Sequence, residues 1–152
     1  MASSTLVNDL SSSSVGCSSK RIVETYKVKD GVTVLAGQWV ALDVAAAGVE
    51  ASRTVLIATA SVASNIPVGV ALTGGVGVAS GSVTIEVIIA GYAAAAYCNT
   101  GVAAGAPIMS GATGKPVAYL GTGLTSTVQP CGYTLKLAAA NLADVIVTCS
   151  PI

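Results

Sequence analysis

The stretch Gly81-Ser-Val-Thr-Ile-Glu-Val-Ile-Ile-Ala-Gly91 carries the most regular pattern in the sequence. Successive side chains of a β-strand point to opposite faces of its sheet. In this stretch one face would carry only β-branched apolar residues, namely Val83, Ile85, Val87 and Ile89. The pattern therefore predicts a strand over Ser82–Ala90 with one face in a hydrophobic core.

Short β-branched or aromatic segments, separated by Gly, Asn, Asp and Pro, lie on both sides of this strand. They are Arg21–Val28, Gln38–Asp43, Thr54–Ala60, Pro67–Leu72, Tyr92–Tyr97, Pro107–Met109, Pro116–Leu120, Gly132–Leu137 and Val145–Cys149. Helical periodicity is nearly absent, and only Lys136–Ala143 could form a short helical turn. The sequence predicts an all-β fold, a small barrel or sandwich of short strands.

The same scheme occurs twice along the chain. Ala36-Gly37-Gln-Trp-Val, then Pro67-Val-Gly-Val-Ala-Leu, then the strand at Val83 is matched by Ala104-Gly105-Ala-Pro-Ile, Pro130-Cys-Gly-Tyr-Thr-Leu and Val145. Glycine after alanine suits a turn with positive φ, and the glycine two residues after proline permits close approach of a strand. This pseudo-repeat predicts two similar β units that close one pseudo-symmetric barrel; the alternative is chance similarity.

The first residues have a different composition. Residues 1–19 contain eight of the sixteen serines. A segment so polar buries too little to order itself. We expect residues 1–20 to form a flexible Ser-rich arm, either a passive tail or a tether to a partner, and residues 21–152 to form a single β domain.

Composition excludes several classes of protein. The net charge is zero, 9% of residues are charged, and there is no histidine. Nucleic-acid binding needs clustered cations, so we expect no nucleic-acid partner. The long uncharged stretches contain Pro and several Gly, so no membrane helix is expected. The N-terminus lacks the pattern of a signal peptide, which indicates the cytosol. So few charges suit a subunit buried in an assembly.

No catalytic or cofactor-binding constellation is found. Without histidine a Ser-His-Asp triad is impossible, and no phosphate-binding Gly-Lys motif occurs. Asp43, Glu50 and Arg53 fall in one predicted loop and are expected to form a surface ion pair. We expect a protein that is not an enzyme and carries no cofactor.

The four cysteines are Cys17, Cys98, Cys131 and Cys149. They form no C-x-x-C pair, so no metal site is expected. We expect Cys98, Cys131 and Cys149 to be buried apolar thiols, and Cys17 to be exposed.

Several of these segments resemble the head-decoration, or capsid cement, proteins of tailed bacteriophages. The resemblance rests on Gly37-Gln-Trp-Val-Ala-Leu, Pro67-Val-Gly-Val-Ala-Leu-Thr, the Gly81–Gly91 strand, and Asn99 to Val117. It implies a small β-barrel that forms a homotrimer on the outside of the head and stabilises the major-capsid lattice. The partners would be other copies and the major capsid protein, in a virion assembled in the host cytoplasm.

Candidate contact residues follow from this interpretation. In the arm, Leu6, Val7, Leu10 and Val15 would fill shallow pockets on the capsid, beside Lys20 and Arg21 at the junction with the barrel. Trp39, Tyr92 and Tyr97 would lie in the oligomer interface, since aromatic residues are enriched there. The alternatives are a core position for Trp39 and ordinary strand packing for the two tyrosines.

A different structural role remains open. A tail or baseplate β-module, or a bacterial surface adhesin domain, would share the short strands and the low charge. The missing signal peptide counts against the adhesin.

Overall fold

The computed structural model describes residues 21–59, 66–79, 81–119 and 130–149. These contain two short 3-10 helices, Gly48–Ser52 (η2) and Ala112–Gly114 (η3), and are otherwise strands and turns. The strands are β1 (Arg21–Val28), β2 (Thr33–Val34), β3 (Trp39–Leu42), β4 (Thr54–Ile57), β5 (Pro67–Ala71), β6 (Gly75–Val76), β7 (Thr84–Tyr97), β8 (Pro107–Met109), β9 (Val117–Ala118), β10 (Gly132–Thr134) and β11 (Leu142–Val147). The predicted all-β fold is confirmed.

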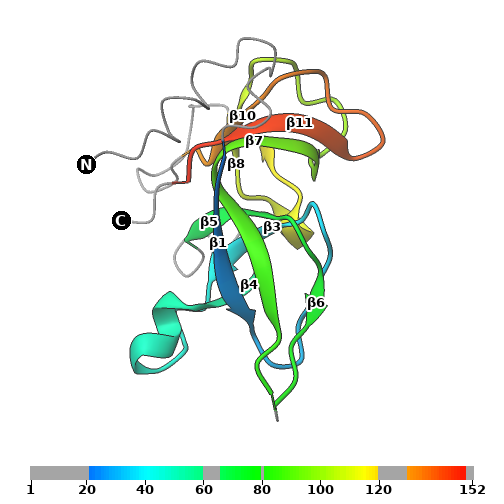
Figure 1. Ribbon diagram of the computed structural model, residues 1–152. Helices are drawn as coiled ribbons and strands as arrows, with labels where there is room; N and C mark the ends of the chain where they lie inside the picture. The colour runs from blue at the N-terminus through cyan, green and yellow to red at the C-terminus, as the bar shows by residue number, and fades with distance from the viewer. Residues whose placement is uncertain (1–20, 60–65, 80, 120–129, 150–152) are drawn as a thin grey trace, which may run out of the picture.

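Five strands close a barrel in the lower half of the molecule (Figure 1). Their order is β1-β4-β3-β5-β7, and β7 returns to pair with β1. Only the β1–β4 pair is parallel. The interior side chains come from all five strands and include Val28, Val40, Val55, Val68 and Ile85.

Strand β7 runs on beyond this barrel into the upper half of the molecule (Figure 1). Its first half pairs with β1 and β5, and its second half, from Gly91 to Tyr97, pairs with β11. The sheet continues through β10 and β8 to β9. The two strands expected at Ser82–Ala90 and Tyr92–Tyr97 are therefore one long strand.

The upper strands repeat the pairings of the lower barrel. Val40 faces Gly69 and Ile57 in the lower barrel, as Ile108 faces Gly132 and Ala118 in the upper one. The turn bonds match as well: the Gly37 nitrogen donates to the Ala71 oxygen at 2.7 Å, and the Gly105 nitrogen to the Thr134 oxygen at 2.7 Å. The upper half is thus a second copy of the same unit, with β8, β9, β10 and β11 in the places of β3, β4, β5 and the first half of β7.

Equivalent backbone hydrogen bonds close the two barrels. The Lys29 nitrogen donates to the Val55 oxygen at 2.9 Å in the first barrel, and the Asn99 nitrogen donates to the Pro116 oxygen at 2.9 Å in the second. In this scheme the second half of β7 takes the place of β1. Because β7 belongs to both barrels, cutting them apart would break a strand of each.

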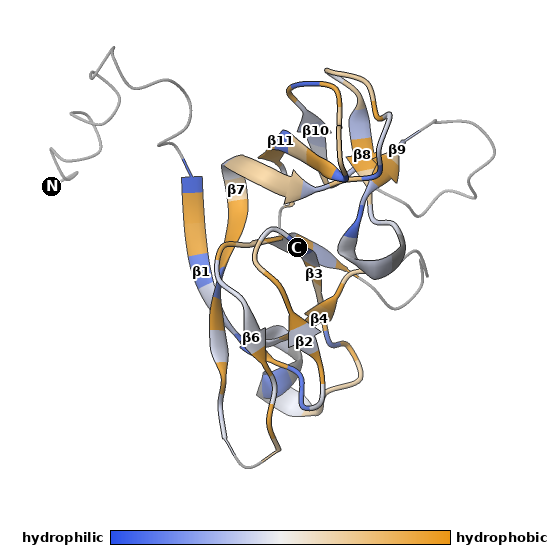
Figure 2. Ribbon diagram, turned by 90° about the vertical axis from the view of Figure 1, so that its right-hand side faces the viewer, coloured by the Kyte–Doolittle hydropathy of each residue, from blue (hydrophilic) through white to orange (hydrophobic). Residues whose placement is uncertain are grey.

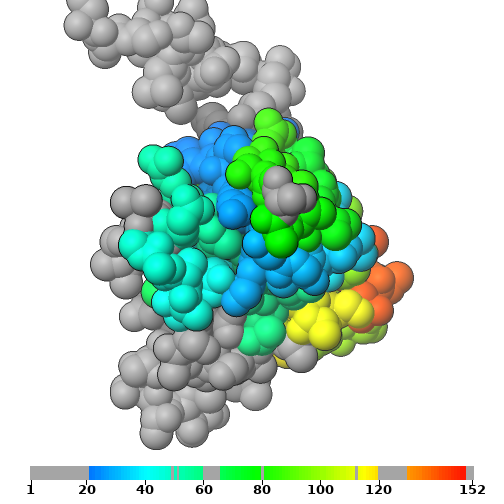
Figure 3. All heavy atoms as spheres, turned by 90° about the horizontal axis from the view of Figure 1, so that it is seen from below, coloured from blue at the N-terminus to red at the C-terminus, as the bar shows by residue number. Residues whose placement is uncertain are grey.

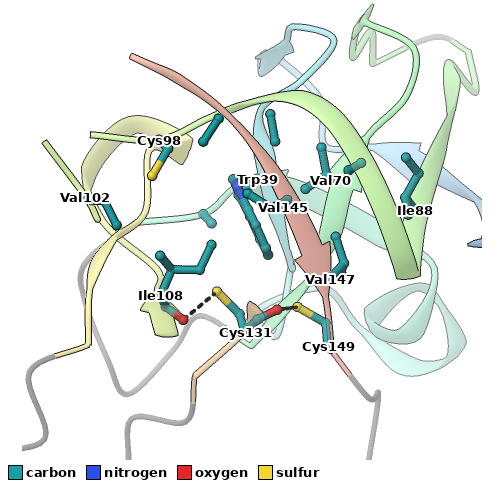
Figure 4. Close-up of a cluster of buried hydrophobic side chains, with 14 of the residues drawn as sticks. Trp39, Val70, Ile88, Cys98, Val102, Ile108, Cys131, Val145, Val147 and Cys149 are labelled. Atoms are coloured by element: carbon teal, nitrogen blue, oxygen red, sulfur yellow. Dashed lines mark hydrogen bonds between the residues drawn. The ribbon is translucent and has the colours of Figure 1, made fainter. Parts of the chain in front are cut away.

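The two cores differ in one respect. Positions filled by Tyr26 and Ile85 in the first core carry Ala96 and Ala143 in the second. The second core instead contains Trp39, which comes from the first barrel and has no exposed surface (Figure 4). Its indole nitrogen donates to the Tyr97 oxygen at 3.1 Å. Trp39 therefore joins the barrels by filling space that small side chains leave in the second.

A small lid covers the lower end of the first barrel. Strands β2 and β6 pair with each other there, and Val34 of β2 is buried in the first core. Seen from below, the green β6 segment lies against the blue segment of β2 (Figure 3). The lid belongs to the first barrel.

The structure corrects three details of the sequence prediction. Lys136–Ala143 forms no helical turn; Ala140 and Asn141 have positive φ, and Ala139 forms a β-bridge with Leu142. The repeat is present, but its two units do not close one common barrel. Its third element is also shifted, since Val145 faces Thr134 as Val87, not Val83, faces Ala71.

Candidate interaction surface

A row of outward side chains crosses the first barrel where the second barrel covers it. Following the strand pairings, it consists of Val23, Ile88, Val70, Trp39 and Ala58. The last four are at most 2% exposed, and they belong to the core cluster of the second barrel. This row is therefore the contact between the barrels.

No part of the chain that the structure describes covers the corresponding row on the second barrel, here called the outer row. It consists of Tyr92, Ile146, Tyr133, Pro107 and Tyr119. Tyr133 is 44% exposed and the other four side chains are partly exposed. The outer row holds three of the five tyrosines of the chain. Figure 2 shows the strands that carry it, β7, β8, β10 and β11, on the upper barrel.

Further apolar side chains extend the outer row. Leu135, Leu137 and Leu142 are 48%, 61% and 40% exposed. Leu142 faces Tyr97 across the β7–β11 pair. An interface core is typically apolar, rich in tyrosine and poor in charge. This surface has that composition.

One ion pair crosses this surface. The Lys136 ammonium lies 2.8 Å from the Asp144 carboxylate. The hydrogen bond from Lys136 and a second from the Ala95 backbone nitrogen hold the pKa of Asp144 below its usual range. Ala95 has a φ of 49°, so Asp144 anchors a left-handed residue at the point where the β7–β11 register shifts. The pair is neutral as a whole and has a structural role within the surface.

The structure places the three predicted interface residues differently. Trp39 is completely buried inside the chain, so the expectation that it contacts a second copy is wrong; its core alternative holds. Tyr92 lies in the outer row, and Tyr97 lies beside Gly37 and opposite Leu142. Both tyrosines are partly exposed, and their role in an interface stays a prediction.

The predicted docking arm falls mostly outside the described residues. This applies to Leu6, Val7, Leu10, Val15 and Lys20. Arg21 is exposed and opens β1, opposite Gly91. The first five residues of β1 are all exposed, with Ile22 at 57%. In the described part of the chain β1 pairs with β4 only at Lys27 and Val28, so this half of β1 has one unpaired edge.

Cys98, Cys131 and Cys149 are buried, as predicted, and all three lie in the second core (Figure 4). Burial and the nearby Cys131 raise the pKa of Cys98 to about 11. A hydrogen bond with Cys131 and burial raise the pKa of Cys149. Thiols are poor nucleophiles when protonated, so these groups are packing residues. Cys17 lies outside the described residues.

The expected surface ion pair among Asp43, Glu50 and Arg53 is wrong for Asp43. Asp43 is buried and pairs with Lys29 at 3.1 Å, and it accepts a hydrogen bond from the Ala45 nitrogen. Across the described ranges no cluster of three His, Cys, Asp or Glu side chains could hold a metal ion. Within those same ranges no helix is long and apolar enough to cross a membrane.

The outer row was missed by the sequence analysis, although a signal for it was present. The repeat aligns Tyr133 with Val70 and Pro107 with Trp39. Tracing which positions of the first unit face outward would have identified the second set. The repeat alone could not show that, among the described residues, the first row is covered by the other barrel and the second row is not.

Comparison with known proteins gives one informative likeness. No known protein-family model matches the sequence, and no curated protein matches it. The fold is similar to that of the N base of the head fiber gp8.5 in bacteriophage phi29, with a TM-score of 0.55 and 18% sequence identity. The match covers 86% of this chain and 97% of that one. At this identity the likeness establishes a shared fold.

Proposed function

We propose that this protein is a structural component of a bacteriophage head, a decoration or cement protein that binds the outside of the capsid and stabilises the major-capsid lattice. The observation that carries the proposal is the likeness to the base of a phage head fiber, which extends over nearly the whole fold. The sequence motifs, which resemble head-decoration proteins, point the same way. The proposal assigns no catalytic residue and no cofactor to the chain.

The surface chemistry supports a role in assembly. The outer row and its leucines form an apolar face whose one ion pair is neutral. Monomeric proteins rarely leave such a face uncovered. In the proposal the protein forms a homotrimer whose copies present the same capsid contacts together. Three weak contacts on one rigid trimer bind a lattice far more tightly than one.

The N-terminal segment would supply part of the capsid contact. Arg21 follows this segment in the sequence and opens β1, whose first half has one edge unpaired among the described residues. An extended segment can bind by adding a strand to a sheet edge on its partner, with alternate side chains in pockets. Leu6, Val7, Leu10 and Val15 would be those side chains, and Lys20 and Arg21 would mark the edge of the contact.

The test is a binding and imaging experiment on the parent phage. Heads assembled without this protein are incubated with the purified chain, sedimented, and reconstructed by electron cryo-microscopy. We expect saturable binding, density on the outer surface of the head, and heads that resist heating better than undecorated heads. Density confined to the tail or baseplate, or no binding to heads, would overturn the proposal.

A further inference from the structure

The repeat makes the two outward rows directly comparable. Four of the five positions of the outer row have a counterpart, fixed by strand pairing, that contacts the other barrel. Tyr133 corresponds to Val70, Ile146 to Ile88, Pro107 to Trp39 and Tyr119 to Ala58. Within the described residues the same surface is thus buried between the barrels in the first unit and uncovered in the second.

The outer row is not polar. Its side chains are apolar or aromatic, and Tyr119 and Tyr133 are larger than their counterparts Ala58 and Val70. In repeat architectures the last unit needs a polar outer face to remain soluble. Among the residues that the structure describes, the second barrel has no such polar cap, and the exposed Leu135 beside the row adds to its apolar area.

The described residues also leave uncovered a surface on the first barrel that such a row could contact. Inside the molecule, Trp39 of the first row lies against Gly132 and Tyr97, and the Tyr97 nitrogen donates to the Gly37 oxygen. The second half of β7 therefore makes part of the contact, beside residues of β8, β10 and β11. Its counterpart in the first barrel is β1, whose first half is exposed and has an unpaired edge in the described part of the chain.

We infer that a second copy of this chain covers the outer row, and that it does so with the exposed first half of its β1. In this arrangement the second barrel of one copy contacts the first barrel of the next copy. The barrels of neighbouring copies thus follow each other as the two barrels do within one chain. The contact is head-to-tail, so each copy uses two different surfaces, and a rotation between copies closes it into a ring. Ile22, which is 57% exposed, and Tyr133 lie on opposite sides of this contact.

The inference deepens the self-association in the proposed function and does not depend on binding to a capsid. Its experiment therefore uses the full-length chain alone in solution, and a failure to bind heads would leave its result unchanged. Molar mass is measured by light scattering after gel filtration and by sedimentation equilibrium. The variants are Tyr133→Asp or Leu135→Asp on the outer row and Ile22→Asp on β1.

A matched control places the same charge elsewhere. Val76 on the lid strand β6 is 53% exposed and far from both surfaces in sequence and fold, so Val76→Asp should keep the wild-type mass. Each row or β1 variant should fall to the monomer mass while its circular dichroism stays that of the wild type. A wild type that is monomeric, or row variants that keep the wild-type mass, would overturn the inference.

Mixing the variants tests the head-to-tail arrangement. A Tyr133→Asp chain retains an intact β1, and an Ile22→Asp chain retains an intact outer row. One undamaged contact can therefore form between them, and the mixture should yield dimers that contain one chain of each kind. If the mixture stays monomeric while the wild type assembles, the pairing of the outer row with β1 is wrong.

Discussion

Two glycines determine how closely the strands of each barrel approach. A Cβ added at Gly69 would overlap the Ile88 carbonyl oxygen, and one added at Gly132 would overlap the Ile146 carbonyl oxygen. The sequence predicted this role from the Pro-x-Gly pattern. It also predicted the turn glycines Gly37 and Gly105, whose φ values are 85° and 76°.

Replacing either strand glycine with alanine should destabilise the protein strongly. Overpacking of a core typically costs about 1–3 kcal/mol, and here the clash is with a backbone carbonyl that the sheet holds in place. We expect Gly69→Ala and Gly132→Ala each to lower the free energy of unfolding by about 3 kcal/mol, measured by urea denaturation.

Gly81 provides the control for this prediction. Its φ is not in the left-handed region, and a Cβ there would meet only the Val78 side chain at 3.4 Å. Gly81→Ala should therefore leave the unfolding midpoint unchanged. Equal midpoints for all three variants would contradict the assigned role of the strand glycines.

Strand β7 shows what the sequence could and could not predict at the level of elements. The bounds of β1 and β8 were predicted as observed. The continuation of β7 through Gly91 was not, because glycine beside alanine reads as a break between strands. In the structure Gly91 has a φ of 98° and pairs on both sides, with Arg21 and Val147. Tertiary pairing outweighs the local signal there.

The bulge in β7 gives a pH-dependent prediction. Lys136 and the Ala95 backbone nitrogen lower the pKa of Asp144, so the folded state favours the charged carboxylate. Its contribution is present at neutral pH and is lost as the pH falls through the lowered folded pKa. The difference in thermal midpoint between the wild type and Asp144→Asn should thus be small at neutral pH, because the pair is exposed, and vanish in acid.

A second substitution separates the charge from the anchor. The side-chain amide of the Asp144→Asn variant can still accept a hydrogen bond from the Ala95 nitrogen, whereas the methyl group of Asp144→Ala cannot. We expect Asp144→Ala to be less stable than Asp144→Asn by about 1 kcal/mol at neutral pH, the usual net contribution of one hydrogen bond. Two variants of equal stability would show that the Ala95 bond does not hold the bulge.

At the scale of the whole molecule, Trp39 unites the two barrels. From the sequence we weighed two positions for it, a core position and, as the sharper hypothesis, an anchor in an oligomer interface. In the structure Trp39 lies between the two barrels of the same chain, and its indole nitrogen donates a hydrogen bond to the Tyr97 oxygen. A pattern of alternation shows which residues share a face, but it does not show whether another part of the chain covers that face.

Removing the indole should therefore weaken both barrels together. Large-to-small substitutions of buried aromatic residues cost about 3–5 kcal/mol, and Trp39→Ala should lie in this range. Trp39→Phe keeps most of the ring volume and loses the hydrogen bond to Tyr97, so it should cost less. Calorimetry and circular dichroism would measure both, and a Trp39→Ala protein as stable as the wild type would contradict a joint between the barrels.

The last prediction concerns residues 2–19. Neither described core contains a residue before Tyr26, so deletion of this segment should leave the circular dichroism and the thermal midpoint unchanged. Each small apolar side chain buried on a capsid contributes about 1–2 kcal/mol, offset by about 1 kcal/mol or more for each residue that becomes ordered. One arm would add little, but several arms on one oligomer act together. We therefore expect the truncated protein to bind heads more weakly.

A full-length variant in which serine replaces Leu6, Val7, Leu10 and Val15 should bind heads as weakly as the truncated protein, which would assign the lost binding to these four side chains. If the truncated chain binds as tightly as the full chain, the segment is a passive tail, and the heads are held by the barrels alone.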